Sequence, residues 1–227
     1  MSRRFPLILV AAIVVAGVFA SASPVSAVVN PLHVQLSFVQ RATGFTQPVG
    51  VVGARDGTSR LYVLEKTGRI RLWHNGVLQT APYLDLSAKV STASERGLLG
   101  LAFDPSFRTR PQLWVIYTAI NGDVTLARFR ATSFTAPSVS SATQVTLLTI
   151  PHAAGNHNGG SLTFGTDNLL YWSVGDNADN VTAQNTYRLT GKILRLDVLR
   201  SCGSLRYCIP ASNPFAISSV YRREIWL

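Results

Sequence analysis

The segment with the clearest structural signal reads Gly97-Leu-Leu-Gly-Leu-Ala-Phe103, then Asp104, Leu113-Trp-Val-Ile-Tyr117 and Gly122-Asp-Val124. Short apolar runs rich in β-branched and aromatic side chains are separated here by Asp and Gly, residues that favour turns. This order predicts three antiparallel strands: a first with small residues, an aromatic second, and a third entered through a glycine turn. The aromatic strand is apolar on both faces, as expected of a strand buried between stacked sheets.

The same order of elements occurs three times along the chain. Each repeat has a turn aspartate, an aromatic residue early in the second strand and a glycine before the third strand. These shared positions are Asp56, Asp104 and Asp167, then Tyr62, Trp114 and Tyr171, then Gly68, Gly122 and Gly191. The aromatic positions 62, 114 and 171 are separated by 52 and 57 residues. A repeat of that length with several strands is typical of β-propeller blades, which stack because one blade cannot bury both its faces.

We therefore predict an all-β fold of the β-propeller class. A β-sandwich with similar strand spacing is the alternative, because alternating strands are common to both architectures. The glycines of the first strands are expected to let neighbouring backbones approach each other near the propeller axis. The tryptophans of the strands, Trp73, Trp114 and Trp172, are expected to pack inside the blades.

The first 27 residues are predicted to be a signal peptide. Arg3 and Arg4 give a positive start, an apolar stretch follows, and Val25-Ser26-Ala27 has the small-x-small pattern of a cleavage site. The apolar stretch is short for a membrane helix, which needs about 20 residues, so an uncleaved anchor is the less favoured alternative. We expect an exported protein, secreted or periplasmic, with residues 28–227 as its mature part and no stable membrane span.

Charge and cysteine content narrow the possible partners. The formal net charge is +10, but the basic residues are scattered singly along the strands, without a Lys/Arg-rich run or an aromatic RNA-binding motif. This pattern argues against nucleic acid as a partner. Cys202 and Cys208 have no nearby histidine with which to form a zinc site. In an oxidising compartment a small loop disulfide is the natural interpretation, although the sequence leaves the pairing open.

Six motifs follow one another along the chain. They are Glu95-Arg-Gly-Leu-Leu-Gly-Leu-Ala-Phe-Asp-Pro-Ser-Phe107, Asn156-His-Asn-Gly-Gly-Ser-Leu-Thr-Phe-Gly165, Tyr171-Trp-Ser-Val-Gly-Asp176, Leu189-Thr-Gly-Lys-Ile-Leu-Arg-Leu-Asp197, Ile209-Pro-Ala-Ser-Asn-Pro-Phe215 and Glu224-Ile-Trp226. In this order they resemble the glucose/sorbosone dehydrogenase family, which includes soluble glucose dehydrogenases and aldose sugar dehydrogenases that depend on pyrroloquinoline quinone (PQQ). The resemblance extends from about Phe38 onward.

The resemblance implies a six-bladed quinoprotein propeller that binds PQQ near its axis, with calcium beside the quinone. An aldose sugar is expected to lose its C1 hydride to PQQ, with an external acceptor receiving the electrons afterwards. His157 matches the histidine that takes the hydroxyl proton, and imidazole suits this task because its ordinary pKa lies near neutrality. Asp176 matches the carboxylate that orients the histidine and stabilises its charged form.

Two further residues are candidates for contact with the cofactor. Asn158 follows the histidine and could be a polar neighbour of cofactor or substrate, or a turn residue. Glu95 stands where relatives place a polar group by the active site, and its alternative is a solvent-facing loop carboxylate. No residue of the chain is proposed as a metal ligand, because the calcium ligands of relatives are expected beyond Leu227.

The sequence departs from the family pattern at its end. Relatives continue into an Arg-Asn-Pro motif and later blades, whereas this chain is expected to hold only the first three to four blades of six. We therefore expect the N-terminal half of a ring, as a fragment or truncated form without full activity, or a half-ring completed as a homodimer. The alternatives to an enzyme are a non-catalytic extracellular propeller that binds a partner, and an inert truncated remnant.

Overall fold

The computed structural model describes residues 37–227, and the compact unit discussed below spans residues 40–227. The predicted signal peptide, residues 1–27, lies outside the described residues. Within them, two short 3₁₀ turns, η2 (Ser141–Thr143) and η3 (Thr182–Gln184), accompany a fold made otherwise of β-strands. In this described part we find no helix long and apolar enough to cross a bilayer.

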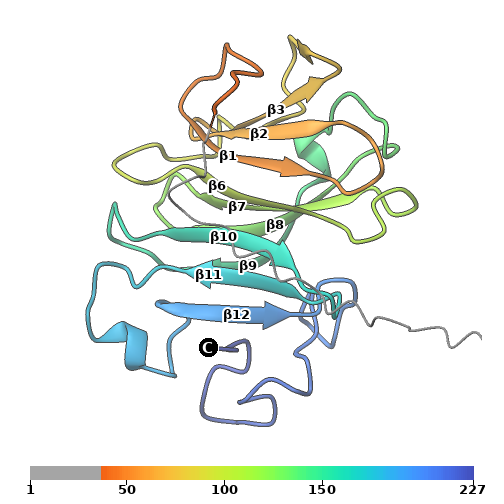
Figure 1. Cartoon of the computed structure of the whole chain (residues 1–227). Helices are drawn as coiled ribbons and strands as arrows, with labels where there is room; N and C mark the ends of the chain where they lie inside the picture. Colours follow the sequence, from red (N-terminus) through yellow and green to blue (C-terminus); the bar gives the residue numbers. More distant parts are fainter. Residues whose placement is uncertain (1–36) are drawn as a thin grey trace, which may run out of the picture. The chain divides into compact units, whose positions relative to one another are not determined.

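Antiparallel strands form three sheets, which follow one another through the unit (Figure 1). Blade 1 contains β1 (Pro48–Gly53), β2 (Leu61–Glu65), β3 (Arg69–His74), β4 (Val77–Leu78) and β5 (Leu84–Asp85). Blade 2 contains β6 (Leu98–Phe103), β7 (Gln112–Thr118), β8 (Val124–Arg130) and β9 (Val145–Ile150). Blade 3 contains β10 (Gly159–Phe164), β11 (Leu170–Val174) and β12 (Lys192–Leu196). The three sheets coincide with the three predicted repeats.

The strand register shows that the repeats are equivalent. In each blade the last residue of the first strand pairs with a leucine of the second strand. The residue that follows this leucine is the shared aromatic residue, which is Tyr62, Trp114 or Tyr171. Each turn aspartate accepts a hydrogen bond from the backbone N–H two residues later, as the sequence predicts. The three turn glycines all have positive φ, which glycine adopts without steric penalty.

The blades stack face to face, and β7 lies in the middle of the stack. Its side chains alternate between two apolar clusters. Leu113, Val115 and Tyr117 join the cluster shared with blade 1, and Trp114 and Ile116 join the cluster shared with blade 3. Because residues 113–117 of β7 are all apolar, the strand can bury both of its faces, as the sequence predicts.

The prediction that the tryptophans pack inside the blades is confirmed for two of the three. Trp114 and Trp172 are fully buried. Trp73 is only partly buried, which corrects the expectation. It lies near the end of β3, where it pairs with Leu78 of the two-residue strand β4, so little of the sheet remains to cover it.

The first strands approach closely at two glycines, as expected. Gly100 of β6 lies against the backbone of Gly160 of β10, so a Cβ at residue 100 would overlap the Gly160 carbonyl oxygen. A Cβ at residue 160 would in turn crowd Leu99. This contact brings together the segments that precede the two strands, residues 93–97 and 151–158, and these segments build the candidate site.

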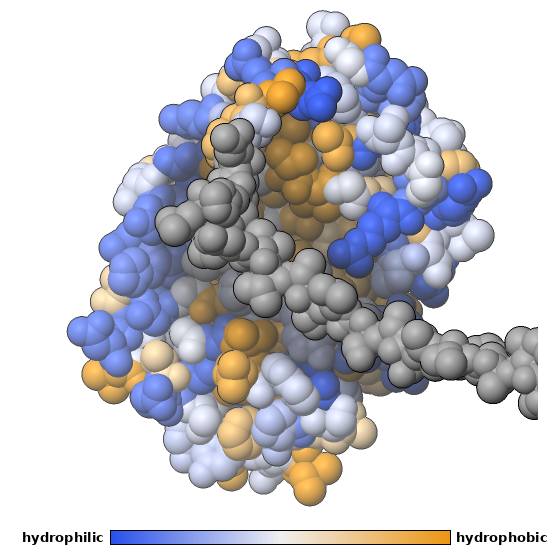
Figure 2. Space-filling model, viewed as in Figure 1, coloured by the Kyte–Doolittle hydropathy of each residue, from blue (hydrophilic) through white to orange (hydrophobic). Residues whose placement is uncertain are grey.

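The outer faces of the stack are less well covered. Val49 and Val51 of β1 are 49% and 60% exposed, and Figure 2 shows apolar surface over this part of the unit. On the opposite side, residues 224–227 lie along β12 through backbone hydrogen bonds to Ile193 and Arg195. The guanidinium of Arg195 stacks on Trp226, with 3.6 Å between its central carbon and the ring centroid. The expected disulfide between Cys202 and Cys208 is present in the loop after β12.

Candidate active site

His157 lies at the end of the segment that leads into β10, and its backbone has an unusual conformation. Its φ is +56°, in the left-handed region that non-glycine residues rarely adopt. Its carbonyl oxygen lies against Gly175, so closely that no Cβ could be accommodated at residue 175. The sequence pattern Asn156-His-Asn-Gly-Gly160 thus forms a tight turn packed on the end of β11.

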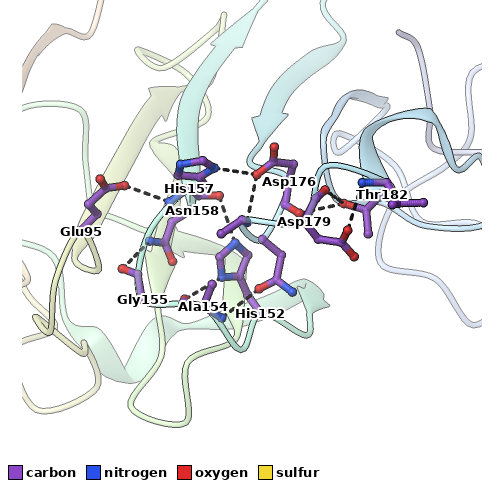
Figure 3. Close-up of polar contacts among 12 residues, drawn as sticks. Glu95, His152, Ala154, Gly155, His157, Asn158, Asp176, Asp179 and Thr182 are labelled. Carbon is purple, nitrogen blue, oxygen red and sulfur yellow. Dashed lines mark hydrogen bonds and ion pairs between the residues drawn. The ribbon is translucent and has the colours of Figure 1, made fainter.

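Glu95 and His152 hold the His157 peptide in place from its two sides (Figure 3). The His157 N–H donates to Oε2 of Glu95 at 2.9 Å, and the Glu95 N–H donates to the Gly155 carbonyl at 3.0 Å. The His157 carbonyl oxygen lies 3.0 Å from Nε2 of His152. Glu95, predicted beside the active site, therefore contacts the backbone of the proposed base.

The side chains of His157 and Asp176 form a pair. Nδ1 of His157 lies 2.8 Å from Oδ1 of Asp176, which follows β11 directly. Because a carboxylate only accepts, Nδ1 carries the proton and the lone pair of the neutral ring is on Nε2. The His157 side chain is 52% exposed, so it is accessible to a substrate. The hydrogen bond from His157 lowers the pKa of the Asp176 carboxyl, together with a second bond from the Ala178 N–H.

Hydrogen bonds from Thr182 and Lys192 hold the connection that contains Asp176. The hydroxyl of Thr182 donates to the Asp176 carbonyl at 2.7 Å. The Lys192 ammonium, at the start of β12, donates to the carbonyls of Thr182, Ala183 and Thr190 at 2.9, 2.8 and 3.1 Å. Three carbonyl acceptors satisfy the three donors of the ammonium, and they fix the turn η3 beside Asp176.

Asn158 lies beneath the pair and not on the open surface with it. The residue is 2% exposed. Its amide nitrogen donates to the Gly155 carbonyl at 3.2 Å, and its amide oxygen accepts from the Thr118 hydroxyl at 3.4 Å. Its amide thus stabilises the turn that presents His157, and the predicted contact with a cofactor stays a prediction.

Two residues that the structure brings to the site are not indicated by any sequence pattern. His152 lies in a loop-like stretch of the sequence without a motif of its own, yet it is 2% exposed and contacts the His157 carbonyl. Lys192 belongs to a motif but is not marked as an anchor by any local pattern. The contacts of His152 and Lys192 form where a loop folds back on itself, and the spacing of residues along the sequence does not predict such contacts.

A cavity of about 490 Å³ lies between the end of β9 and the connection after β11, and neither His157 nor Asp176 is among the residues that line it. Its lining is mostly polar and aromatic, and includes Asn177, Asp179, Asn185, Tyr187 and Arg188. In residues 37–227 no group of three or more His, Cys, Asp and Glu side chains is placed to hold a metal ion. The chemistry that the pair of His157 and Asp176 can perform is proton acceptance at Nε2 of His157.

Comparison with known proteins agrees with this architecture. The model of the glucose/sorbosone dehydrogenase family matches residues 45–227. Human hedgehog-interacting protein is 33% identical over 202 residues, which cover 81% of this chain and 29% of that protein. The aldose sugar dehydrogenase YliI of Escherichia coli is 29% identical over 162 residues, covering 70% of this chain and 42% of the enzyme.

A solved structure shows the same fold. The PQQ-bound aldose sugar dehydrogenase of Streptomyces coelicolor superposes with a TM-score of 0.64 at 24% identity, over 82% of this chain and 51% of that one. The chain thus spans about half the length of this enzyme, and less than half of the two relatives above. With its three stacked blades and six ordered motifs, the chain belongs to the glucose/sorbosone dehydrogenase family and forms an N-terminal portion of its propeller.

Proposed function

We propose that the protein to which this chain belongs oxidises aldose sugars at C1 in a PQQ-dependent reaction, with His157 as the general base. The observation that carries the proposal is the pair of His157 and Asp176, with 2.8 Å between Nδ1 and Oδ1 and an accessible imidazole. The family to which the chain belongs supports the class of reaction.

The chain's own residues would act on the proton. Nε2 of His157 accepts the proton of the sugar C1 hydroxyl, and the positive charge that develops on the ring is stabilised by Asp176. Asp176 also fixes the tautomer, because its oxygen is occupied by the Nδ1 proton. Glu95 holds the His157 N–H with one carboxylate oxygen, so its other oxygen could accept a hydrogen bond from a sugar hydroxyl or cofactor group.

PQQ would supply the hydride acceptor when bound. The residues at the pair fit the proton-accepting part of this chemistry. Two nearby cations are engaged elsewhere: Lys66 donates to the Ser94 carbonyl, and Arg96 donates to the carbonyls of Ala153 and Ala154. We therefore assign no residue of this chain to the PQQ carboxylates, and no ligand to calcium. Glu95 and Asn158 remain our proposed neighbours of the cofactor.

The location and remaining partners follow from the same proposal. An exported protein, secreted or periplasmic, agrees with the disulfide between Cys202 and Cys208, since such bonds persist in oxidising compartments. An aldose is the proposed substrate, and an external acceptor would reoxidise the cofactor.

The test uses the protein in its full natural length, reconstituted with PQQ and calcium and assayed by dye reduction with glucose. His157→Ala should lower kcat by about 10²–10⁴-fold, the usual contribution of a positioned base. His74→Ala, which removes a histidine of β3 outside the site, is the matched control and should keep full activity. Full activity of His157→Ala would remove this residue from the mechanism.

A second candidate function is supported by one relative. Hedgehog-interacting protein is named for binding a protein partner, and it shares 33% identity with this chain. A propeller that binds a partner through its surface would need neither PQQ nor the pair. Titration of the full-length protein with PQQ, followed by visible absorbance, separates the two functions: no binding at micromolar PQQ would favour the binding module.

A further inference from the structure

His152 is a buried histidine whose two ring nitrogens both face carbonyl oxygens. Nδ1 lies 3.1 Å from the Ala154 oxygen, and Nε2 lies 3.0 Å from the His157 oxygen. The residue is 2% exposed. A carbonyl oxygen can only accept, so each contact becomes a hydrogen bond when the facing nitrogen carries a proton. The neutral ring can make one of these bonds and the imidazolium both.

The two carbonyls differ in how many donors they have. The Ala154 oxygen also receives Nη2 of Arg96 at 3.4 Å. For the His157 oxygen, Nε2 of His152 is the sole donor found among the described residues. Loss of His152 would therefore leave the Ala154 carbonyl with a partner and the His157 carbonyl, packed against Gly175, with none.

The His157 peptide needs external support because of its conformation. Its φ of +56° is disfavoured for a residue with a side chain. Glu95 fixes the peptide on its nitrogen side, at 2.9 Å, and His152 fixes it on its carbonyl side. Backbone orientation sets the direction of the Cα–Cβ bond, and with it the approach of Nδ1 to Asp176.

We propose that His152 is a positioning residue for His157: its Nε2–H holds the His157 carbonyl and so keeps the imidazole aligned with Asp176. The inference rests on the proposed role of His157 as base, but the alignment itself exists without cofactor or sugar. The contact of Nδ1 with Ala154 is secondary, because Arg96 shares that carbonyl.

Three substitutions separate the two ring nitrogens. His152→Gln places an amide N–H near the position of Nε2, His152→Asn places one near Nδ1, and His152→Phe keeps a buried ring without a donor. If the Nε2 contact positions His157, Gln should preserve the alignment and both Asn and Phe should disturb it. A merely structural anchor for the Ala154 turn predicts the opposite order, with Asn closest to the native residue.

The first measurement is the ring ¹⁵N spectrum of His157 in the 227-residue chain, which shows which nitrogen carries the proton. The native chain and His152→Gln should show the Nδ1–H form, and His152→Phe and His152→Asn should show a mixture with the Nε2–H form. Thermal melting of each variant identifies any that fail to fold. The native spectrum in His152→Phe, or rescue by Asn instead of Gln, would overturn the proposal.

The second measurement is steady-state kinetics of the full-length, PQQ-reconstituted protein. His152→Phe should lower kcat by about 10²-fold with KM nearly unchanged, since small misplacements of a catalytic group have effects of this size. If the full-length native protein oxidises no sugar while the ¹⁵N spectra change as expected, the proposed function fails and the positioning role stands. If it oxidises sugar and His152→Phe equals the native protein in kcat and spectrum, the positioning role fails alone.

Discussion

Blades 2 and 3 share one strand plan but differ in the connection between their second and third strands. In blade 2, β7 and β8 are joined by residues 119–123, a tight turn closed by Gly122. In blade 3, residues 175–191 join β11 and β12, and they include Asp176 and the turn η3 before they end at Gly191. Both connections have a glycine of positive φ, Gly122 or Gly191, within their last two residues.

The comparison shows that the candidate site uses a longer connection between the second and third strands, while the order and pairing of these strands are the same in both blades. Strand register and the closing glycine are retained, so the stacking of the blades is unaffected. Val181 and Tyr187 of the longer connection are exposed, and the Lys192 ammonium holds the connection through three of its carbonyls. Loops positioned by a rigid scaffold are where binding and catalytic residues are usually found.

The largest expected effect comes from the aromatic position that the two blades share. Trp114 is fully buried between blades, whereas Tyr171 is partly exposed and its hydroxyl donates to Asp167 at 2.9 Å. Trp114→Ala should lower the free energy of unfolding by about 3–5 kcal/mol, and Tyr171→Ala by clearly less. Denaturant unfolding of the two variants measures the difference. Equal losses would mean that the two blades are packed alike.

A smaller effect is expected at Gly175, where blade 3 begins its longer connection. A methyl group at this position would overlap the His157 carbonyl. Gly175→Ala should therefore destabilise the fold by about 1–3 kcal/mol, as overpacked sites do, and should separate His157 from Asp176. Gly53→Ala, where nothing lies within 4 Å of a new Cβ, is the control. Retention of the native melting temperature by Gly175→Ala would show that the turn can relax.

Lys192 allows the anchor of the longer connection to be tested by pH. Lys192→Met leaves three carbonyls without their donor and should cost about 1–3 kcal/mol at neutral pH. Burial lowers the pKa of the Lys192 ammonium below its ordinary 10.5, so the unfolded chain binds this proton more tightly than the folded chain. The stability of the native chain should then rise with pH between the folded pKa and about 10.5.

Melting curves measured from neutral pH to pH 10.5 check this sign. In Lys192→Met the contribution of this group to the pH dependence should be absent. If native and variant chains differed in stability by the same amount at every pH, the predicted contribution of Lys192 to the pH dependence would be contradicted.

The smallest effect is expected from the pair itself, because Asp176 is only partly buried and His157 is half exposed, so that solvent screens their interaction. The hydrogen bond from His157 lowers the pKa of Asp176 below 3.8, so the carboxylate's stabilising contribution is complete above that pH. It is lost as the pH falls through the lowered pKa. The ¹³C shift of the Asp176 carboxyl, followed from pH 6 to about 2, should give a lower midpoint in the native chain than in His157→Gln. Identical midpoints would mean that the pair does not form in solution.

Much of the fold was predictable because its signals are local. The three turn aspartates, the glycines of positive φ and the aromatic second strands each depend on residues close in sequence, and the structure has them in equivalent register. Trp73 shows the limit of such reasoning. Its strand resembles the others, but its neighbour β4 is only two residues long and leaves the indole partly exposed.

The candidate site was predictable only in part. The resemblance to the family indicated His157, Asp176 and Glu95, and the structure brings all three together. It did not indicate that Asn158 is buried beneath them, or that His152 supports the His157 carbonyl.

The amino-acid pattern was thus sufficient for three strands of each blade, their turns and the number of repeats, because hydrogen bonding and side-chain alternation act over a few residues; it did not predict β4, β5 and β9. Whether a histidine is buried or exposed depended on the packing of segments distant in sequence. His152 and His157 are five positions apart in one loop, yet the first is enclosed and the second is half exposed. Glu95, which precedes β6 of blade 2, reaches the N–H of His157, which precedes β10 of blade 3, only because the two blades stack.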